Sequence, residues 1–274
     1  MVMTIHVPDT LNAVTAENYH VSIRLCPDGL SFSGYTPDDK GSFFTETVTL
    51  KRDVPMIQSL KDIFFNSPCM SYVYRSLYVI NVSEKYTIAP EGLFSGKEKD
   101  ELFSFCFQEE KGVKVLVQPL TAIHAFLIYA MDSEVYEFLM RSLVNPVFMH
   151  FLSKLLLAWH KKSLTCYQKQ LYVMLHPSFF DLVCFERGEL LFLNAFHHKT
   201  DADIIYSLMY VCRQIGMNQL EDQLYFCGDQ KKSQSVMTTI ENYIRHTCYL
   251  PLQIDKYSLG VSPSLLMDEE NLKK

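Results

Sequence analysis

The chain has 274 residues, of which 48% are hydrophobic and 20% are charged, and this composition excludes a globally disordered protein. Its length fits one large domain or two smaller ones. The net charge is −6 and no run of Lys and Arg exceeds two residues, so we expect no nucleic-acid partner.

In the first half, hydrophobic alternation and turn residues predict three strands joined by tight turns, then a helix. These are His20–Leu25, Leu30–Thr36, Phe43–Leu50 and the helix Pro55–Phe65. Strands are predicted next at Tyr72–Val82, Tyr86–Ala89 and Val113–Gln118, and helices at Lys97–Phe107, Ser133–Val144 and Val147–His160. The apolar run Ile123–Ala130 fits a strand or a helix, because its length does not settle the choice.

The second half repeats the pattern of the first. Strands are predicted at Leu171–Leu175, Phe179–Phe185 and Glu189–Phe196, a helix at Thr200–Ile215, a strand at Gln223–Cys227, and a last helix from Ser235 to Cys248. Thr200 with Asp203 three residues later is close to a capping box at the start of the first of these helices.

A meander of three antiparallel strands followed by a helix brings the next strand back parallel to the first. The fold class predicted is therefore α/β, with two tandem ribonuclease-H-like units, each a mixed sheet with flanking helices. We expect a first unit over 11–130, a helical connection over 131–163, a second unit over 164–254 and a polar tail over 255–274. Two such units in tandem are the architecture of the actin-like ATPase superfamily.

The stretch LYVMLHPSFFDLVCFERGELLFLNAF in the second half resembles PilM and the cytoplasmic domain of type II secretion L proteins. With NYHVSIRLCPDGLSF and the strand around Tyr78, the chain also resembles an uncharacterised Bacteroidetes family of unknown function, DUF3822. This second resemblance covers roughly Leu11–Ile254 and consists of distributed apolar patterns. It implies the fold and not an activity.

The resemblance to actin-like ATPases implies phosphate-binding turns that carry Asp and Gly at the start of each half. Candidate cofactor-binding residues are therefore Asp28 and Gly29 in the first turn, Ser178 in the second, and Gly228 and Asp229 after the last predicted strand. Both turns depart from the pattern, because Pro27 and Pro177 each remove a backbone N–H donor. Asp-Gly is also an ordinary tight-turn pair, which needs no ligand.

Other motifs predict no chemistry. His197 and His198 with Asp201 and Asp203 are the only metal-like group, but adjacent strand residues point to opposite faces. The eight cysteines include no C-x-x-C pair, and free thiols suit a reducing cytoplasm. The first ten residues lack the basic and apolar segments of a signal peptide, and the most apolar run, Val147–Trp159, is too short to span a membrane.

We therefore expect a cytoplasmic, non-catalytic protein with an actin-like fold that binds or assembles with a protein partner. We expect no catalytic residue, no metal and no bound cofactor. The alternative is an actin-like ATPase with a nucleotide in the cleft between the units, since ligands commonly bind between domains.

Overall fold

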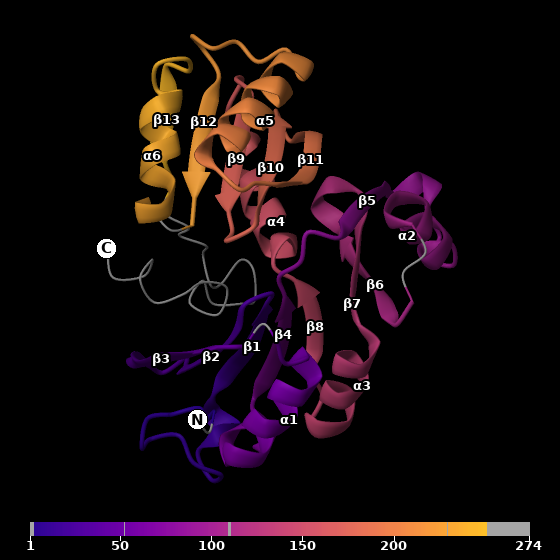
Figure 1. Cartoon of the computed structure of the whole chain (residues 1–274), viewed down its shortest axis with the longest axis vertical. Helices are drawn as coiled ribbons and strands as arrows, with labels where there is room; N and C mark the ends of the chain where they lie inside the picture. Colours follow the sequence, from indigo (N-terminus) through magenta and orange to yellow (C-terminus); the bar gives the residue numbers. More distant parts are fainter. Residues whose placement is uncertain (1–2, 52, 109–110, 229, 251–274) are drawn as a thin grey trace.

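The computed structural model describes residues 3–51, 53–108, 111–228 and 230–250. Two five-stranded sheets lie one above the other along the long axis, and a smaller three-stranded sheet lies beside them (Figure 1). The predicted tail over 255–274 and the candidate residue Asp229 lie outside the described residues.

The first sheet has the strand order β3-β2-β1-β4-β8. Its strands are β1 (His20–Cys26), β2 (Gly29–Thr36), β3 (Asp39–Thr49), β4 (Ser76–Asn81) and β8 (Val147–His150). The first three are antiparallel neighbours, whereas β4 and β8 are parallel to β1. One face is covered by α1 (Met56–Asn66) and α3 (Ser133–Ser142), whose Leu60 and Leu139 pack with Val21 and Ile23 of β1 in a buried cluster.

The second sheet repeats this order as β11-β10-β9-β12-β13. Its strands are β9 (Gln170–Leu175), β10 (Phe179–Glu186), β11 (Glu189–His197), β12 (Gln223–Cys227) and β13 (His246–Tyr249). The helices α5 (Asp201–Gln214) and α6 (Gln230–Ile240) cover one face of it. At the start of α5, Thr200 and Asp203 form the predicted capping box. Because β1 and β9 are both the central strand of their sheet, the predicted duplication is confirmed.

The third sheet is inserted in the first unit between β4 and α3. It consists of β5 (Tyr86–Pro90), β7 (Ala125–Asp132) and β6 (Val113–Leu120) in that spatial order, with α2 (Lys99–Phe107) against it. The run Ile123–Ala130 is therefore a strand for most of its length. Short 3-10 turns complete the described elements at Ala16–Asn18, Pro68–Ser71, Glu91–Leu93 and Thr121–Ile123.

Two predicted helices were wrong in part. The predicted helix Val147–His160 begins with the strand β8, which pairs with β4, and only α4 (Leu152–Ser163) is helical. The helix predicted from Ser235 to Cys248 is α6, which ends at Ile240, and β13 follows it and pairs with β12. Both strands are only four residues long. A run this short does not distinguish a strand from a helix by its sequence pattern, and pairing with a neighbouring strand decides between them.

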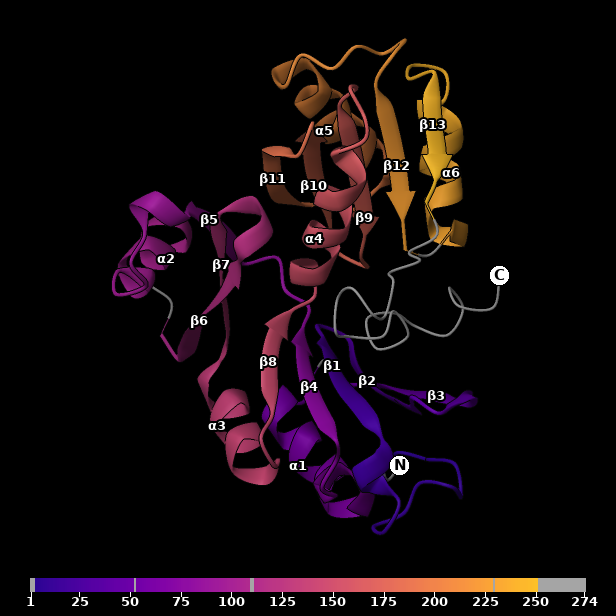
Figure 2. The same ribbon diagram turned by 180° about the vertical axis from the view of Figure 1, so that it is seen from behind.

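The helix α4 connects β8 to β9 and packs on the face of the second sheet opposite α5 and α6 (Figure 2). The residues 131–163, predicted as a helical connection, therefore include β8 of the first sheet as well as α4. Trp159 of α4 stacks on Tyr172 of β9 with ring centroids 4.6 Å apart, and Tyr172 in turn stacks on Tyr225 of β12. These rings belong to one buried cluster that also contains Ile80 of β4. The two units thus share a continuous core, while their predicted boundaries stay a prediction.

Candidate functional site at the junction of the two units

The carboxyl ends of the parallel strands from both large sheets point toward the junction between the units, as the arrows of β8 and β12 show (Figure 1). In open α/β sheets, ligands bind at this end of the strands. A ligand-binding site of this fold is therefore expected at the junction.

In the first turn, between β1 and β2, Asp28 and Gly29 contribute to backbone hydrogen bonding and to strand packing. The Asp28 carbonyl oxygen accepts a hydrogen bond from Leu50 N at 3.0 Å, and the Asp28 side chain is exposed. A Cβ atom on Gly29 would lie 2.9 Å from the Val48 carbonyl oxygen. The glycine therefore allows β3 to approach β2, which explains its presence without a phosphate.

The second turn, between β9 and β10, is tied to the end of β11. His176 N donates to the Phe179 carbonyl oxygen at 2.9 Å. The backbone N–H of His198 donates to the Ser178 carbonyl oxygen at 3.2 Å, and its ring Nε2 donates to the His176 carbonyl oxygen at 2.9 Å. Ser178 itself is exposed. The turn is held by hydrogen bonds within the protein, and its proline has no N–H to offer an anion.

The third candidate, Gly228, follows β12 with φ of 94°, a conformation that favours glycine. A Cβ atom there would lie 3.1 Å from Met174 Sδ. The Gly228 carbonyl oxygen accepts a hydrogen bond from the hydroxyl of Tyr249. Gly228 lies at the end of a strand, as predicted. Its positive φ explains why this position is a glycine.

A buried hydrogen-bonded group that the sequence analysis did not identify joins the two units. Tyr86 of β5 donates its hydroxyl to Asp181 Oδ1 at 2.5 Å, and His176 Nε2 donates to Asp181 Oδ2 at 2.9 Å. Asp181, near the start of β10, is fully buried. Burial and the Asp181 carboxylate raise the pKa of Tyr86 well above its ordinary value, so the phenol keeps its proton and donates.

Aromatic rings surround this hydrogen-bonded group. His176 stacks on Phe179 at 4.2 Å between centroids and meets the edge of Phe151 at 4.9 Å. His150, at the end of β8, lies 5.0 Å from the ring of Tyr86. Aromatic rings therefore pack around the hydrogen-bonded group where the second turn meets the inserted sheet. A signal was present in the sequence, since a single Asp within the apolar run of β10 requires a buried partner.

His150 is fully buried and donates Nε2 to the Ser83 carbonyl oxygen at 3.0 Å. Its Nδ1 has no hydrogen-bond partner among the described residues. Burial, assisted by the nearby His176 and opposed by the bond to Ser83, lowers the pKa of His150 from 6.5 to about 3. The imidazole is therefore neutral in the folded protein.

This burial predicts a pH dependence of stability. Between pH 6.5 and about 3 the unfolded chain binds a proton at His150 that the folded chain does not, so stability falls as the pH falls. The expected loss from this residue is about 2 kcal/mol between pH 7 and 4.5, since each pH unit is worth roughly 1.4 kcal/mol at most. Urea unfolding of wild type and His150→Phe at both pH values measures it. Equal pH dependence in the two proteins would contradict the prediction.

The histidines and carboxylates of the metal-like group, His197, His198, Asp201 and Asp203, do not converge on one site. His197 Nδ1 lies 3.2 Å from Glu84 Oε2, His198 binds the second turn, and Asp203 caps α5. Within the described ranges, no group of three or more His, Cys, Asp or Glu side chains is placed to hold a metal ion. Likewise, no helix in the described part of the chain is both long and apolar enough to cross a membrane.

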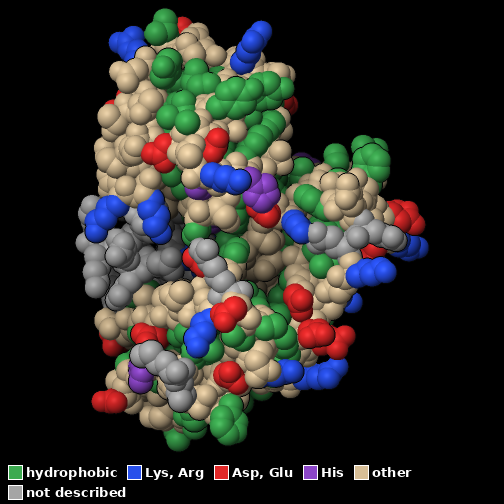
Figure 3. All heavy atoms as spheres, viewed as in Figure 1, with side chains coloured by type: hydrophobic (Ala, Val, Ile, Leu, Met, Phe, Trp, Pro, Cys, Tyr) green, Lys and Arg blue, Asp and Glu red, His purple; other side chains and the backbone are tan. Residues whose placement is uncertain are grey.

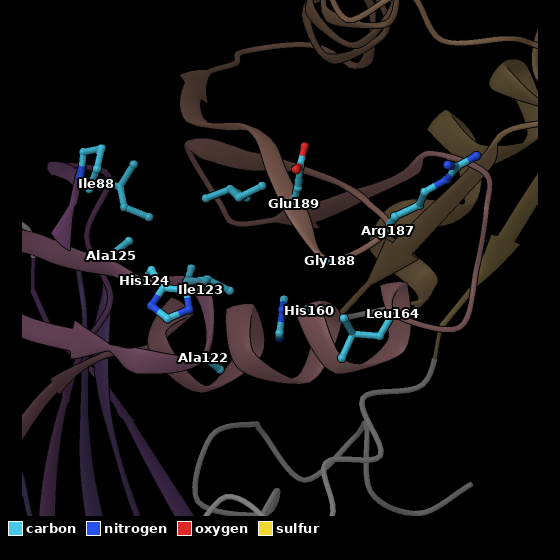
Figure 4. A pocket seen from close by; sticks show the side chains of 12 residues that line it. Ile88, Ala122, Ile123, His124, Ala125, His160, Leu164, Arg187, Gly188 and Glu189 are labelled. Atoms are coloured by element: carbon cyan, nitrogen blue, oxygen red, sulfur yellow. The ribbon is translucent and has the colours of Figure 1, made fainter. Parts of the chain in front are cut away.

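A groove of about 630 Å³ lies next to the junction, between the inserted sheet and the second unit (Figure 4). Residues around Ile88 and Ile123 form one side, and the β10–β11 turn forms the other. His160 of α4 and Leu164, just after α4, form the floor. Burial, with a smaller effect of His124, lowers the pKa of His160. The sequence analysis did not predict this groove, because its sides come from segments far apart in the chain.

Comparisons with known proteins agree with this architecture. A crystal structure from Bacteroides thetaiotaomicron, described as having an actin-like ATPase fold and unknown function, is 26% identical with a TM-score of 0.82. The match covers 94% of this chain and 99% of that one. The PilM–PilN type IV pilus biogenesis complex matches with a TM-score of 0.54 at 11% identity, over 90% of this chain and 96% of that one.

The comparison with curated proteins gives no match. The model of the DUF3822 family, described as proteins of unknown function, matches residues 8–247. The repeated sheet order and this match lead to one assignment: the chain belongs to the DUF3822 family and has an actin-like ATPase fold.

Proposed function

We propose that this protein is a non-catalytic module that uses the actin-like fold to bind or assemble with another protein. The observation that carries the proposal is the buried group of Tyr86, Asp181 and His176 at the junction. A nucleotide between the units would need open space lined by donors at this place. Where the second turn meets the inserted sheet, the described side chains instead form a hydrogen-bonded group surrounded by aromatic rings.

The phosphate turns support the same conclusion. Phosphate cradles use successive backbone N–H groups, and hydrolysis uses carboxylates that hold metal-bound water. The second turn offers a proline and an exposed Ser178 in place of Gly and Asp. Asp28 is the one carboxylate in either turn, and its neighbour Gly29 is explained by strand packing.

The surface and the thiols support a protein partner in the cytoplasm. On the face drawn in Figure 3, Lys and Arg side chains lie in small groups among Asp and Glu side chains, as expected of a protein that does not bind nucleic acid. All eight cysteines are free, which suits a reducing compartment. PilM, which shares the fold, is found in a complex with PilN. Cell fractionation with an epitope-tagged chain tests the location.

The expected result with Mg²⁺-ATP, Mg²⁺-ADP or Mg²⁺-GTP at millimolar concentration is no change in melting temperature and no phosphate release above the blank. A ligand at a hundred times its dissociation constant would add about 2.7 kcal/mol of stability, which a thermal melt detects. A rise that grows with nucleotide concentration and disappears in Asp28→Asn would support the alternative, a nucleotide-binding ATPase. Asp28 is exposed, so this substitution leaves the fold intact.

A further inference from the structure

Two large aromatic side chains lie exposed on the outer face of α5, the helix that covers the second sheet. Tyr206 is 74% exposed and Tyr210 is 53% exposed. They are four residues apart in one helix, so the two rings are neighbours on its surface. On the face drawn in Figure 3, hydrophobic side chains gather over the upper part of the molecule, where α5 lies in Figure 1. Tyrosine is enriched where proteins bind one another, so this pair indicates an interaction surface.

Charged side chains of opposite sign lie on either side of the tyrosine pair. Asp203 is exposed in the first turn of α5, and Arg213 is exposed in its last turn. Asp203 Oδ2 accepts the hydrogen bonds from Lys199 N, Thr200 N and the Thr200 hydroxyl, so Oδ1 can accept a bond from a cation. Arg213 forms no ion pair with any of the described residues. The helix therefore offers a carboxylate at one end and a guanidinium at the other.

These four side chains follow the spacing of a seam between two packed helices. We call Asp203, Tyr206, Tyr210 and Arg213 the α5 stripe. Their separations are three, four and three residues, the alternation that keeps one seam of a helix facing a partner helix. The opposite face of α5, which includes Leu208, is buried in the core of the second unit. The α5 stripe is therefore the face that a partner helix can reach.

The α5 stripe is also symmetric about the position of Leu208. Tyr206 and Tyr210 lie two residues on either side of it, and Asp203 and Arg213 lie five residues on either side. A two-fold axis at this position would pair two α5 helices antiparallel, with each Tyr206 against Tyr210 of the second copy. The same axis would bring each Arg213 to Asp203 of the second copy. Antiparallel packing also places opposite ends of the two helix dipoles together.

We propose that the α5 stripe binds a second copy of this chain, so that two chains form a symmetric dimer through antiparallel α5 helices. The tyrosine rings are buried at the centre of the contact, and an Arg–Asp pair closes each end through charge-assisted hydrogen bonds. A second copy presents the complementary stripe by symmetry, and this self-complementarity is the reason to choose it over an unrelated protein. The inference goes beyond the proposed function, because the dimer forms without any other protein.

Sedimentation velocity of the full chain over a range of concentrations tests the proposal. The wild type is expected to change from the mass of one chain to the mass of two as the concentration rises. Arg213→Glu should weaken the dimer about tenfold or more, because it places a glutamate beside Asp203 at both ends of the contact. Tyr206→Ala should weaken it as well, by removing rings from the centre. Both positions are exposed, and thermal melts confirm that the variants are folded.

A charge exchange tests the antiparallel arrangement itself. Asp203→Lys should dissociate the dimer, because the lysine faces Arg213 of the second copy. An equimolar mixture of Asp203→Lys and Arg213→Glu should dimerise again, since both ends of the contact then join opposite charges. Asp203→Lys also removes the capping box, so a thermal melt first establishes that it is folded. The matched control is Arg141→Glu, an exposed arginine in the last turn of α3, which should leave the dimer unchanged.

Three outcomes would overturn the proposal. A wild type that stays monomeric at every concentration would do so, while the proposed binding of another protein would still stand. A dimer that Arg213→Glu and Tyr206→Ala leave intact would place the contact on a different surface. Two charge variants that remain monomeric when mixed would contradict the antiparallel pairing of Asp203 with Arg213.

Discussion

His176→Ala is expected to lower the free energy of unfolding by about 1.5–3 kcal/mol, the usual contribution of a hydrogen bond to a charged group, because the substitution removes one donor to a buried carboxylate. Asp181 is fully buried, and without His176 its carboxylate keeps one described side-chain donor, the hydroxyl of Tyr86. The substitution also removes the stacking of His176 on Phe179. Urea unfolding followed by circular dichroism measures the loss.

Two controls separate the charge effect from a simple loss of packing. His6→Ala, at an exposed position, should change stability by less than about 0.5 kcal/mol. Adding Asp181→Asn to His176→Ala should recover part of the lost stability, because the amide carries no charge that must be buried. A double variant that is less stable than His176→Ala alone would mean that Asp181 contributes through its shape and not through its charge.

Leu208→Ala is expected to cost about 2–5 kcal/mol, the range for removing a buried leucine side chain. Leu208 is fully buried on the inner face of α5 and packs with Val173 of β9 and Phe226 of β12 in the core of the second unit. Ile204 and Leu208 are both buried on this face of the helix, while Ile205 is half-buried. The shift in the urea midpoint measures the effect.

The matched control is Leu220→Ala, since Leu220 is 66% exposed in the loop before β12. Its midpoint should stay close to that of the wild type. Equal losses of stability in the Leu208 and Leu220 variants would show that burial of Leu208 in this core does not stabilise the second unit. A small loss at Leu208 alone would mean that the neighbouring side chains close the cavity.

The sequence by itself determined the repeated unit. Tight turns and alternating hydrophobicity act between near neighbours in the chain, so the two meanders, α1 and α5 followed from local pattern. The positions of Asp28, Gly29, Ser178 and Gly228 at turns and strand ends were predicted for the same reason. The departures of both turns from a phosphate-binding pattern were also visible in the sequence.

Only the tertiary structure determined that β8 and β13 are strands and which side chains meet at the junction. Both strands are four residues long and complete a sheet that other strands begin, so their partners and not their own sequence specify them. Tyr86 and Asp181 are 95 residues apart and meet only because the inserted sheet lies against the second unit. The groove has the same origin, since its two sides come from the inserted sheet and the β10–β11 turn and its floor comes from α4. Local pattern carries no information about such distant contacts, which form when the two units bury their shared core.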